Sequence, residues 1–238
     1  MQLTRARPNI ALYLAAILTA AMLLGGPILQ PAGYHAFADA RSLSGLANAA
    51  DVLSNLGFLL IGLYGLLHVR PARPAHAMFF VAILMTAFGS SWYHLAPDDA
   101  RLLWDRLPIA LACVSLLAAS LEDAFPARFA ALPTLAALCA LGVASVFWWS
   151  ATGNLGPYLL LQLAPLVLVP ALQWQSGTAL AQRRAFGIAI GLYVLAKVCE
   201  LADGAILDVV HAVSGHTLKH LFATLAALVL ARMIARVA

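Results

Sequence analysis

Charged residues are scarce in this sequence. Asp, Glu, Lys and Arg make up only 10% of its 238 residues, while 63% are hydrophobic. Soluble domains usually carry about 25% charged residues, so a soluble chain of this composition would lack the polar side chains needed to cover its surface. Lipid is the alternative solvent, and there each backbone polar group must be bonded within the protein, which restricts spanning segments to helices or closed barrels.

Period-two alternation is also missing. The apolar runs are long and continuous, which argues against a barrel and favours helices of about 20 residues. We therefore predict an all-α, polytopic transmembrane helical bundle, with a short interfacial helix in the connection 31–51. The eight predicted spans are 9–30, 52–69, 77–95, 105–121, 128–149, 156–174, 184–202 and 214–236.

Cysteine is rare and is not paired. Cys113, Cys139 and Cys199 all fall within apolar runs, and no Cys-x-x-Cys pair occurs. We interpret them as small apolar packing residues, without a disulfide.

Basic residues favour one side of the predicted membrane. A net charge of +4 suggests nucleic acid in a soluble protein, but here the arginines lie in short connections, where they set topology; we expect the bilayer, and no nucleic acid, as partner. With the N-terminus inside, nine arginines are inside and three outside, which predicts that both termini are inside. The inner arginines are Arg5, Arg7, Arg70, Arg73, Arg128, Arg183, Arg184, Arg232 and Arg236, and the outer ones are Arg41, Arg101 and Arg106.

Two further expectations concern location. Short loops rich in arginine are typical of a bacterial inner-membrane protein, whose termini would be cytoplasmic. Arg5 and Arg7 precede the first apolar run as in a signal peptide, but the run is long for one, which favours an uncleaved anchor helix over a cleaved leader.

Polar and titratable residues gather near the outer ends of four spans. Such residues inside a membrane are costly and usually functional, and reversing the orientation would move all of them together. They are Ser90 and His94 at the end of 77–95, Asp105 at the start of 105–121, Lys197, Glu200 and Asp203 at the end of 184–202, and His216 and His220 at the start of 214–236.

The histidines indicate a metal site. His216 and His220, at i and i+4, share one helix face, and His94 lies at the right depth to be a third ligand, which leaves a fourth position for water as in catalytic zinc sites. Asp105 can orient a ligand or accept a proton from that water, and Ser90 can stabilise an oxyanion.

Structural interpretations stay open for each group. Membrane histidines often serve only as hydrogen-bonding residues between helices, a serine commonly bonds its own helix, and Asp105 suits a helix N-terminus. Lys197 and Glu200, at i and i+3, form either a structural ion pair or part of the surroundings of the metal, together with Asp203.

The order Ser90-x-x-x-His94, Asp105 eleven residues later, and a late His216-x-x-x-His220 resembles the alkaline ceramidase family, seven-helix membrane hydrolases related to the adiponectin-type receptors. The segment ADVLSNLGFLLIG at 50–62 is similar to that family's first core helix. The resemblance implies a seven-helix hydrolase core over 51–238, preceded by an anchor helix and outer loop over 1–50.

The same resemblance implies roles at matching positions. His94, His216 and His220 would bind Zn²⁺, Asp105 would activate the zinc-bound water, and Ser90 would polarise the developing oxyanion. The implied reaction is hydrolysis of the amide of a ceramide or related N-acyl membrane lipid to a fatty acid and an amine.

Two departures separate this chain from the animal members. Where those carry an acidic calcium-binding segment, this chain has YHAFADAR with Asp39, and only Asp51 is similar to the family's acidic residue at the head of the first core helix. A Ca²⁺ site on Asp39 and Asp51 is therefore doubtful. The pattern Lys197-x-x-Glu200-x-x-Asp203 also differs, which suggests a bacterial branch with a different substrate.

Three functions compete on this basis. The first is a zinc-dependent lipid amidase, and the second is a lipid-binding, receptor-like protein of the same fold with structural zinc. The third is a transporter with a relay through Lys197, Glu200 and Asp203, which ranks lowest because the sequence indicates no broken or repeated helices.

Overall fold

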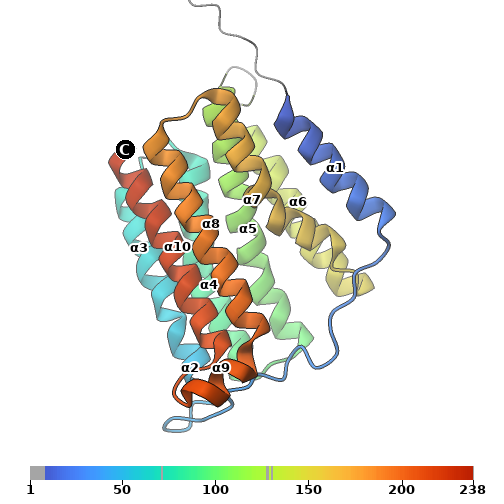
Figure 1. The fold of residues 1–238 in the computed structure, drawn as a ribbon, viewed down its shortest axis with the longest axis vertical. Coiled ribbons are helices and arrows are strands. Elements are labelled where there is room, and N and C mark those ends of the chain that lie inside the picture. Colours follow the sequence, from blue (N-terminus) through green and yellow to red (C-terminus); the bar gives the residue numbers. More distant parts are fainter. Residues whose placement is uncertain (1–8, 71, 127–128, 130, 238) are drawn as a thin grey trace, which may run out of the picture.

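The fold is an all-α bundle. The computed structural model describes residues 9–70, 72–126, 129 and 131–237, and within these ranges it contains no β-strand. The helices are α1 (Ile10–Leu24), α2 (Ala49–Ser54), α3 (Leu56–His68), α4 (Pro74–Leu95), α5 (Asp99–Ala124), α6 (Ala131–Thr152), α7 (Gly156–Ser176), α8 (Leu180–Leu201), α9 (Asp203–Val210) and α10 (Gly215–Val237). Long helices run up and down the bundle, and the short helices α2 and α9 lie together at one end (Figure 1).

Among the described residues, six helical segments are long and apolar enough to cross a membrane, and the bent pair α8 and α9 makes a seventh if it is taken as one span. Helices α2 and α3 count as one of the six, Ala49–His68. These seven segments correspond to the predicted spans from 52–69 onward, which confirms the multi-spanning helical bundle.

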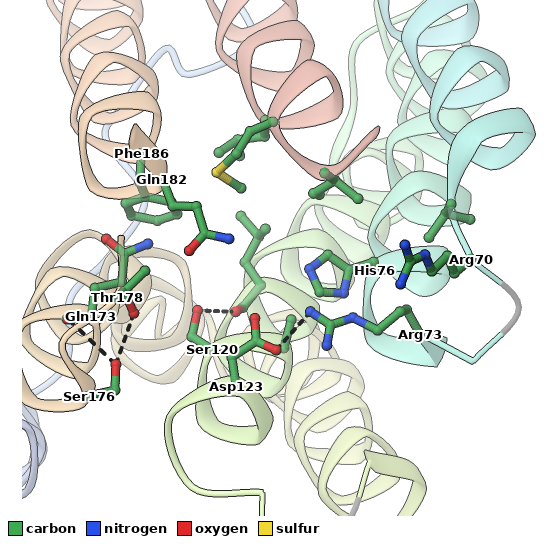
Figure 2. Close-up of a pocket in the computed structure, with 16 residues that line it drawn as sticks. Arg70, Arg73, His76, Ser120, Asp123, Gln173, Ser176, Thr178, Gln182 and Phe186 are labelled. Carbon is green, nitrogen blue, oxygen red and sulfur yellow. Dashed lines mark hydrogen bonds and ion pairs between the residues drawn. The ribbon is translucent and has the colours of Figure 1, made fainter. Parts of the chain in front are cut away.

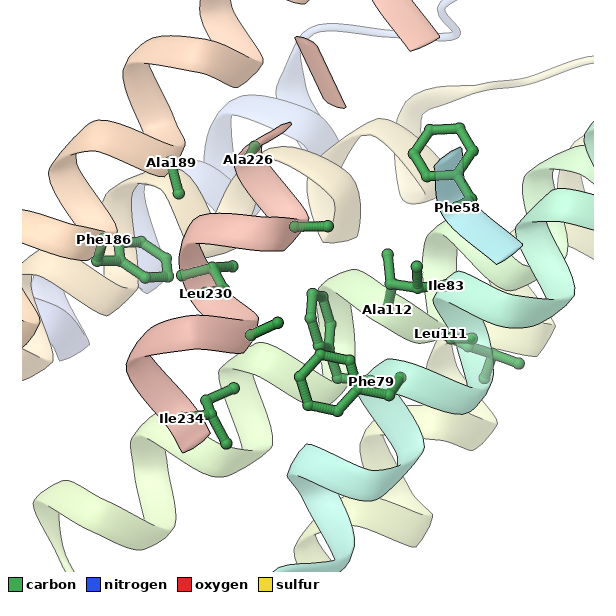
Figure 3. Close-up of a cluster of buried hydrophobic side chains, with 14 of the residues drawn as sticks. Phe58, Phe79, Ile83, Leu111, Ala112, Phe186, Ala189, Ala226, Leu230 and Ile234 are labelled. Carbon is green, nitrogen blue, oxygen red and sulfur yellow. The ribbon is translucent and has the colours of Figure 1, made fainter. Parts of the chain in front are cut away.

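Large apolar side chains lie on the outside of the bundle as well as in its interior. Leu67 is 82% exposed, Phe88 65% and Trp104 55%, as expected where the surroundings are lipid. The largest apolar core lies between α3, α4, α5, α8 and α10, and includes Phe58, Phe79, Ile83 and Leu230 (Figure 3).

The predicted first span, 9–30, is too long. Helix α1 covers only Ile10–Leu24 and ends at Gly25, where Gly26 with φ +75° and Pro27 cannot continue a helix. Fifteen residues rise about 22 Å, less than a hydrocarbon core of about 30 Å. Helix α1 packs against α7 at the side of the bundle (Figure 1).

The interfacial helix predicted in 31–51 does not form: the chain has turns and bends there until α2 begins at Ala49. Helix α5 also begins earlier than the predicted 105, because the Asp98 carboxylate accepts a hydrogen bond from the Arg101 amide at 2.7 Å. Asp105 and Arg106 therefore lie inside the helix, and Arg106 is buried instead of lying in an outer loop.

The expectation that no helix is broken is wrong at one place. Helices α8 and α9 meet at an angle of 82°, with Asp203 at the first position of α9. The Asp203 carboxylate bonds two backbone amides outside its own helix, those of Ala38 and His216, at 2.9 and 2.8 Å. These bonds hold the start of α9 against the connection from α1 and against α10.

Several predictions fall on residues outside the described ranges. They concern the signal-peptide features Arg5 and Arg7 and the inner residue Arg128.

Candidate metal centre

Three histidines converge at the end of the bundle where α2 and α9 lie. His94 is in the last turn of α4, and His216 and His220 are in the first two turns of α10. One ligand atom from each ring lies within 4.8 Å of the others. The exposed fractions are 1%, 6% and 2%, so all three rings are buried.

The separation of two ring nitrogens suits zinc. His94 Nε2 and His216 Nε2 are 3.3 Å apart. Two nitrogens bound at about 2.05 Å to one tetrahedral zinc lie roughly 3.3 Å from each other. The donor set, three neutral imidazoles, also matches a site that keeps one position open.

The third ring has a defined tautomer. The Ser54 hydroxyl donates its proton to the Asp51 carbonyl at 2.7 Å, and its oxygen lies 2.7 Å from His220 Nδ1. Because a hydroxyl has only one proton, Ser54 must accept from Nδ1–H of His220. The lone pair of His220 is then on Nε2, the atom available to a metal.

The connection from α1 covers the histidines. The Phe37 ring lies 4.7 Å from that of His94 and 4.5 Å from that of His216, centroid to centroid. The ring of His35 contacts Tyr93 through Nδ1 at 2.9 Å and Asp99 through Nε2 at 3.2 Å. A segment without regular structure therefore closes the site at this end of the bundle.

An arginine holds this connection in place. Arg41 bonds the Asp39 carboxylate through Nε at 2.7 Å and Nη2 at 2.6 Å, and it donates to the carbonyls of His211 and Ala212 after α9. The hydrogen bonds from Arg41 hold the pKa of the Asp39 carboxyl below its usual value.

Asp105 on α5 faces Ser90 on α4. Both are buried, and the Ser90 hydroxyl and the Lys219 ammonium lie close enough to the Asp105 carboxylate to stabilise its negative charge. Gly89 permits this approach, because a Cβ there would collide with the Trp104 carbonyl. The structure thus brings together Ser90 and Asp105, which the sequence placed at the adjoining ends of two successive spans.

A charged triad lies beside His216. Glu200 accepts from Lys197 Nζ at 2.7 Å and from Lys219 Nζ at 2.8 Å, and Lys219 Nζ is 3.3 Å from His216 Nε2. Lys197 and Glu200 form the predicted pair. Lys219 was missed as a site residue, although its place between the two α10 histidines was a usable signal.

Asp203 has a structural role at the start of α10. It accepts from the His216 backbone amide, one of the amides that a helix N-terminus leaves unpaired. Gly215 allows the contact, since a Cβ there would collide with the Cys199 carbonyl.

Asp39 and Asp51 are not part of the described three-ligand cluster. Asp39 is paired with Arg41, and Asp51 accepts from the Thr217 hydroxyl at 2.6 Å. The second carboxylate oxygen of Asp51 is buried without a partner among the described residues.

Arg106 is enclosed by aromatic rings next to Asp105. Its guanidinium carbon lies 3.9 Å from the Trp149 ring centroid, 5.2 Å from that of Tyr34 and 5.5 Å from that of Tyr158. A buried cation over aromatic faces is stabilised electrostatically, so Arg106 adds a fixed positive charge beside Asp105.

Comparison with protein-family models and with curated proteins finds no match for this chain. The fold and the site therefore define its class by themselves: a helical bundle compatible with a multi-pass membrane protein, with three buried histidines that can hold a metal ion, zinc among them.

Proposed function

We propose that this protein is a zinc-dependent membrane hydrolase that cleaves the amide of an N-acyl lipid, in the manner of the alkaline ceramidases that its motifs resemble. The observation that carries the proposal is the three-histidine cluster with the Ser90–Asp105 pair nearby. A purely structural zinc site commonly has four protein ligands, whereas this cluster offers three.

Zinc, when bound by His94, His216 and His220, supplies a Lewis acid that polarises a carbonyl and makes water more acidic. The chain's own groups then manage protons and charge. Asp105 accepts the proton of the attacking water and delivers it to the leaving amine. Ser90 orients the Asp105 carboxylate while that carboxylate is ionised. Once Asp105 holds the proton, the Ser90 hydroxyl is free to donate to the oxygen on which negative charge develops.

An apolar groove near this site suits an acyl chain. It has a volume of about 270 Å³ and lies between α3 and α4. Its apolar wall includes Leu59, Phe88 and Trp92, and Asn55, at its polar end, follows the Ser54 that bonds His220. We infer that the substrate enters sideways from the bilayer, with its amide toward the histidines.

We also propose the membrane setting. The arginine distribution supports an arrangement in a bacterial inner membrane with the termini in the cytoplasm and the histidines near the periplasmic face.

One observation favours a second function. The Phe37 ring contacts the rings of His94 and His216, and all three histidines of the cluster are almost fully buried. A closed site of this kind suits a receptor-like protein in which zinc is structural and the lipid is bound without turnover.

One experiment distinguishes the two. The purified protein, loaded with zinc, is incubated with a mixture of ceramides and other N-acyl lipids, and released fatty acid is measured. We expect release by the wild type, loss of release in Asp105→Asn, and full release in the matched control Asp208→Asn, an exposed carboxylate of α9. Stoichiometric zinc without release from any lipid supports the receptor-like function. Absence of zinc under metal-preserving conditions, with the His216→Ala variant indistinguishable from wild type, refutes both.

A further inference from the structure

A second polar site lies at the opposite end of the bundle. It is a pocket of about 400 Å³, within the range of small-molecule sites. His76 lines it near the start of α4, whereas His94 lies in the last turn of the same helix, eighteen residues later. This spacing places the two sites about 27 Å apart. This pocket is therefore separate from the histidine cluster, and the inference drawn from it does not rest on the proposed hydrolase activity.

The pocket has one basic wall. Figure 2 shows Arg70, Arg73 and His76 on the same side of the opening. Arg73 is paired with Asp123 at 2.7 Å, whereas the Arg70 guanidinium makes no hydrogen bond or ion pair with any described residue and its carbonyl accepts only from the Arg73 amide. With His76 neutral, the lining carries two positive charges and one negative, so a net positive charge remains.

The opposite wall consists of neutral hydrogen-bonding groups. Gln173 and Gln182 face the basic residues across the pocket (Figure 2), and neither side-chain amide has a partner in the described part of the chain. Ser176 and Thr178 bond each other at 2.9 Å. Amide and hydroxyl donors on one side and guanidinium donors on the other can surround an anion.

One buried atom points to a ligand. His76 is 8% exposed, and its Nδ1 is buried without a hydrogen-bond partner in the described ranges. Buried polar atoms are almost always bonded, and an orphaned one costs about 1–3 kcal/mol. A ligand atom in the pocket would remove this cost.

The pocket also has an apolar floor. Phe186, Leu230, Met233 and Ile234 line it together with the polar groups, and these four side chains are its apolar floor. A ligand that satisfies both parts has an anionic head and an apolar tail, and basic pockets between transmembrane helices bind anionic lipid headgroups.

We propose that this pocket binds the phosphate group of an anionic amphiphile, held by Arg70, His76 and the donors of Gln173 and Gln182. Arg70 binds the phosphate through its planar fork of donors. The apolar floor receives the first part of an acyl chain.

The test uses the full-length protein in a neutral detergent. Short-chain phosphatidylglycerol is titrated and the apparent Kd is taken from the shift in Tm, with phosphatidylcholine as the uncharged comparison and inorganic phosphate as the soluble one. We expect tighter binding of phosphatidylglycerol than of phosphatidylcholine. Arg70→Gln and His76→Gln should each weaken it by about tenfold.

Arg183→Gln is the matched control, because Arg183 is an exposed arginine near the start of α8 that does not line the pocket; it should bind as the wild type does. Inorganic phosphate that stabilises the wild type but not Arg70→Gln also supports the site, and identifies a soluble source for the phosphate. The proposal is refuted if Arg70→Gln binds both probes as the wild type does, or if Arg183→Gln loses as much affinity. If His76→Gln fails to fold, the exposed Arg70 still decides the result.

Discussion

Ser54 fixes the tautomer and orientation of the His220 ring through a hydrogen bond to Nδ1, and it is not itself one of the three candidate metal ligands. Its hydroxyl accepts from His220 Nδ1 and donates to the Asp51 carbonyl, both at 2.7 Å. Ser54→Ala removes the oxygen that fixes the tautomer, so Nε2 of His220 carries the proton for part of the time and cannot bind metal. We predict weaker zinc binding with the fold intact.

The magnitude follows from the contacts that remain. Removing a hydrogen-bond partner of a metal-binding histidine typically costs 10–100-fold in metal affinity. The Asp51 carbonyl lies near the His220 ring and favours a proton on it, so part of the orientation survives, and we expect a loss of about tenfold, or about 1.4 kcal/mol. The Asp51 carbonyl keeps its bond from Asn55 at 2.9 Å, so the free energy of unfolding should fall by only about 0.5–1.5 kcal/mol.

The assay is competition for zinc with a chromophoric chelator, on protein purified in detergent. Ser145→Ala is the matched control, because Ser145 is also buried but, among the described residues, bonds only the Gly142 carbonyl of its own helix. It should bind zinc within about twofold of the wild type, a difference of about 0.4 kcal/mol. Unchanged zinc affinity in Ser54→Ala, or an equal loss in Ser145→Ala, would refute the assigned tautomer.

Two more predictions follow from the same end of the bundle. Glu200→Gln removes the negative charge that pairs with Lys219, whose ammonium lies 3.3 Å from a nitrogen of His216. The uncompensated Lys219 cation should weaken zinc binding, measured by the same competition assay. Adding Lys219→Met to Glu200→Gln should restore zinc binding. Gly89→Val places side-chain atoms against the Trp104 carbonyl and should lower the free energy of unfolding by about 1–3 kcal/mol, measured by thermal unfolding; a Tm equal to that of the wild type contradicts the close packing of α4 and α5.

The helical bundle could be predicted because lipid imposes a local requirement. Each span must satisfy its own backbone and present apolar side chains, so length and composition locate it without reference to its neighbours. Span ends were less predictable. The first helix stops at Gly25, and α5 begins at Asp99, since capping residues and glycines, which hydropathy does not weigh, set those ends.

The convergence of the histidines also followed from the sequence. His216 and His220 share a face because of helix geometry, and alternating topology puts the end of one span beside the start of another. The depth of His94 in the membrane could thus be predicted from the sequence. The 3.3 Å distance between its Nε2 and that of His216 could not be predicted in this way.

Only the tertiary structure decided what surrounds those rings. Phe37 lies in an irregular segment that no periodicity describes, and its position depends on long-range bonds such as that from the Ala38 amide to Asp203. Ser54 and His220 are 166 residues apart, so their hydrogen bond exists only because α2 packs on α10. The sequence alone determined which residues can reach one end of the bundle, since that depends on local helix geometry; their partners depend on how the helices pack.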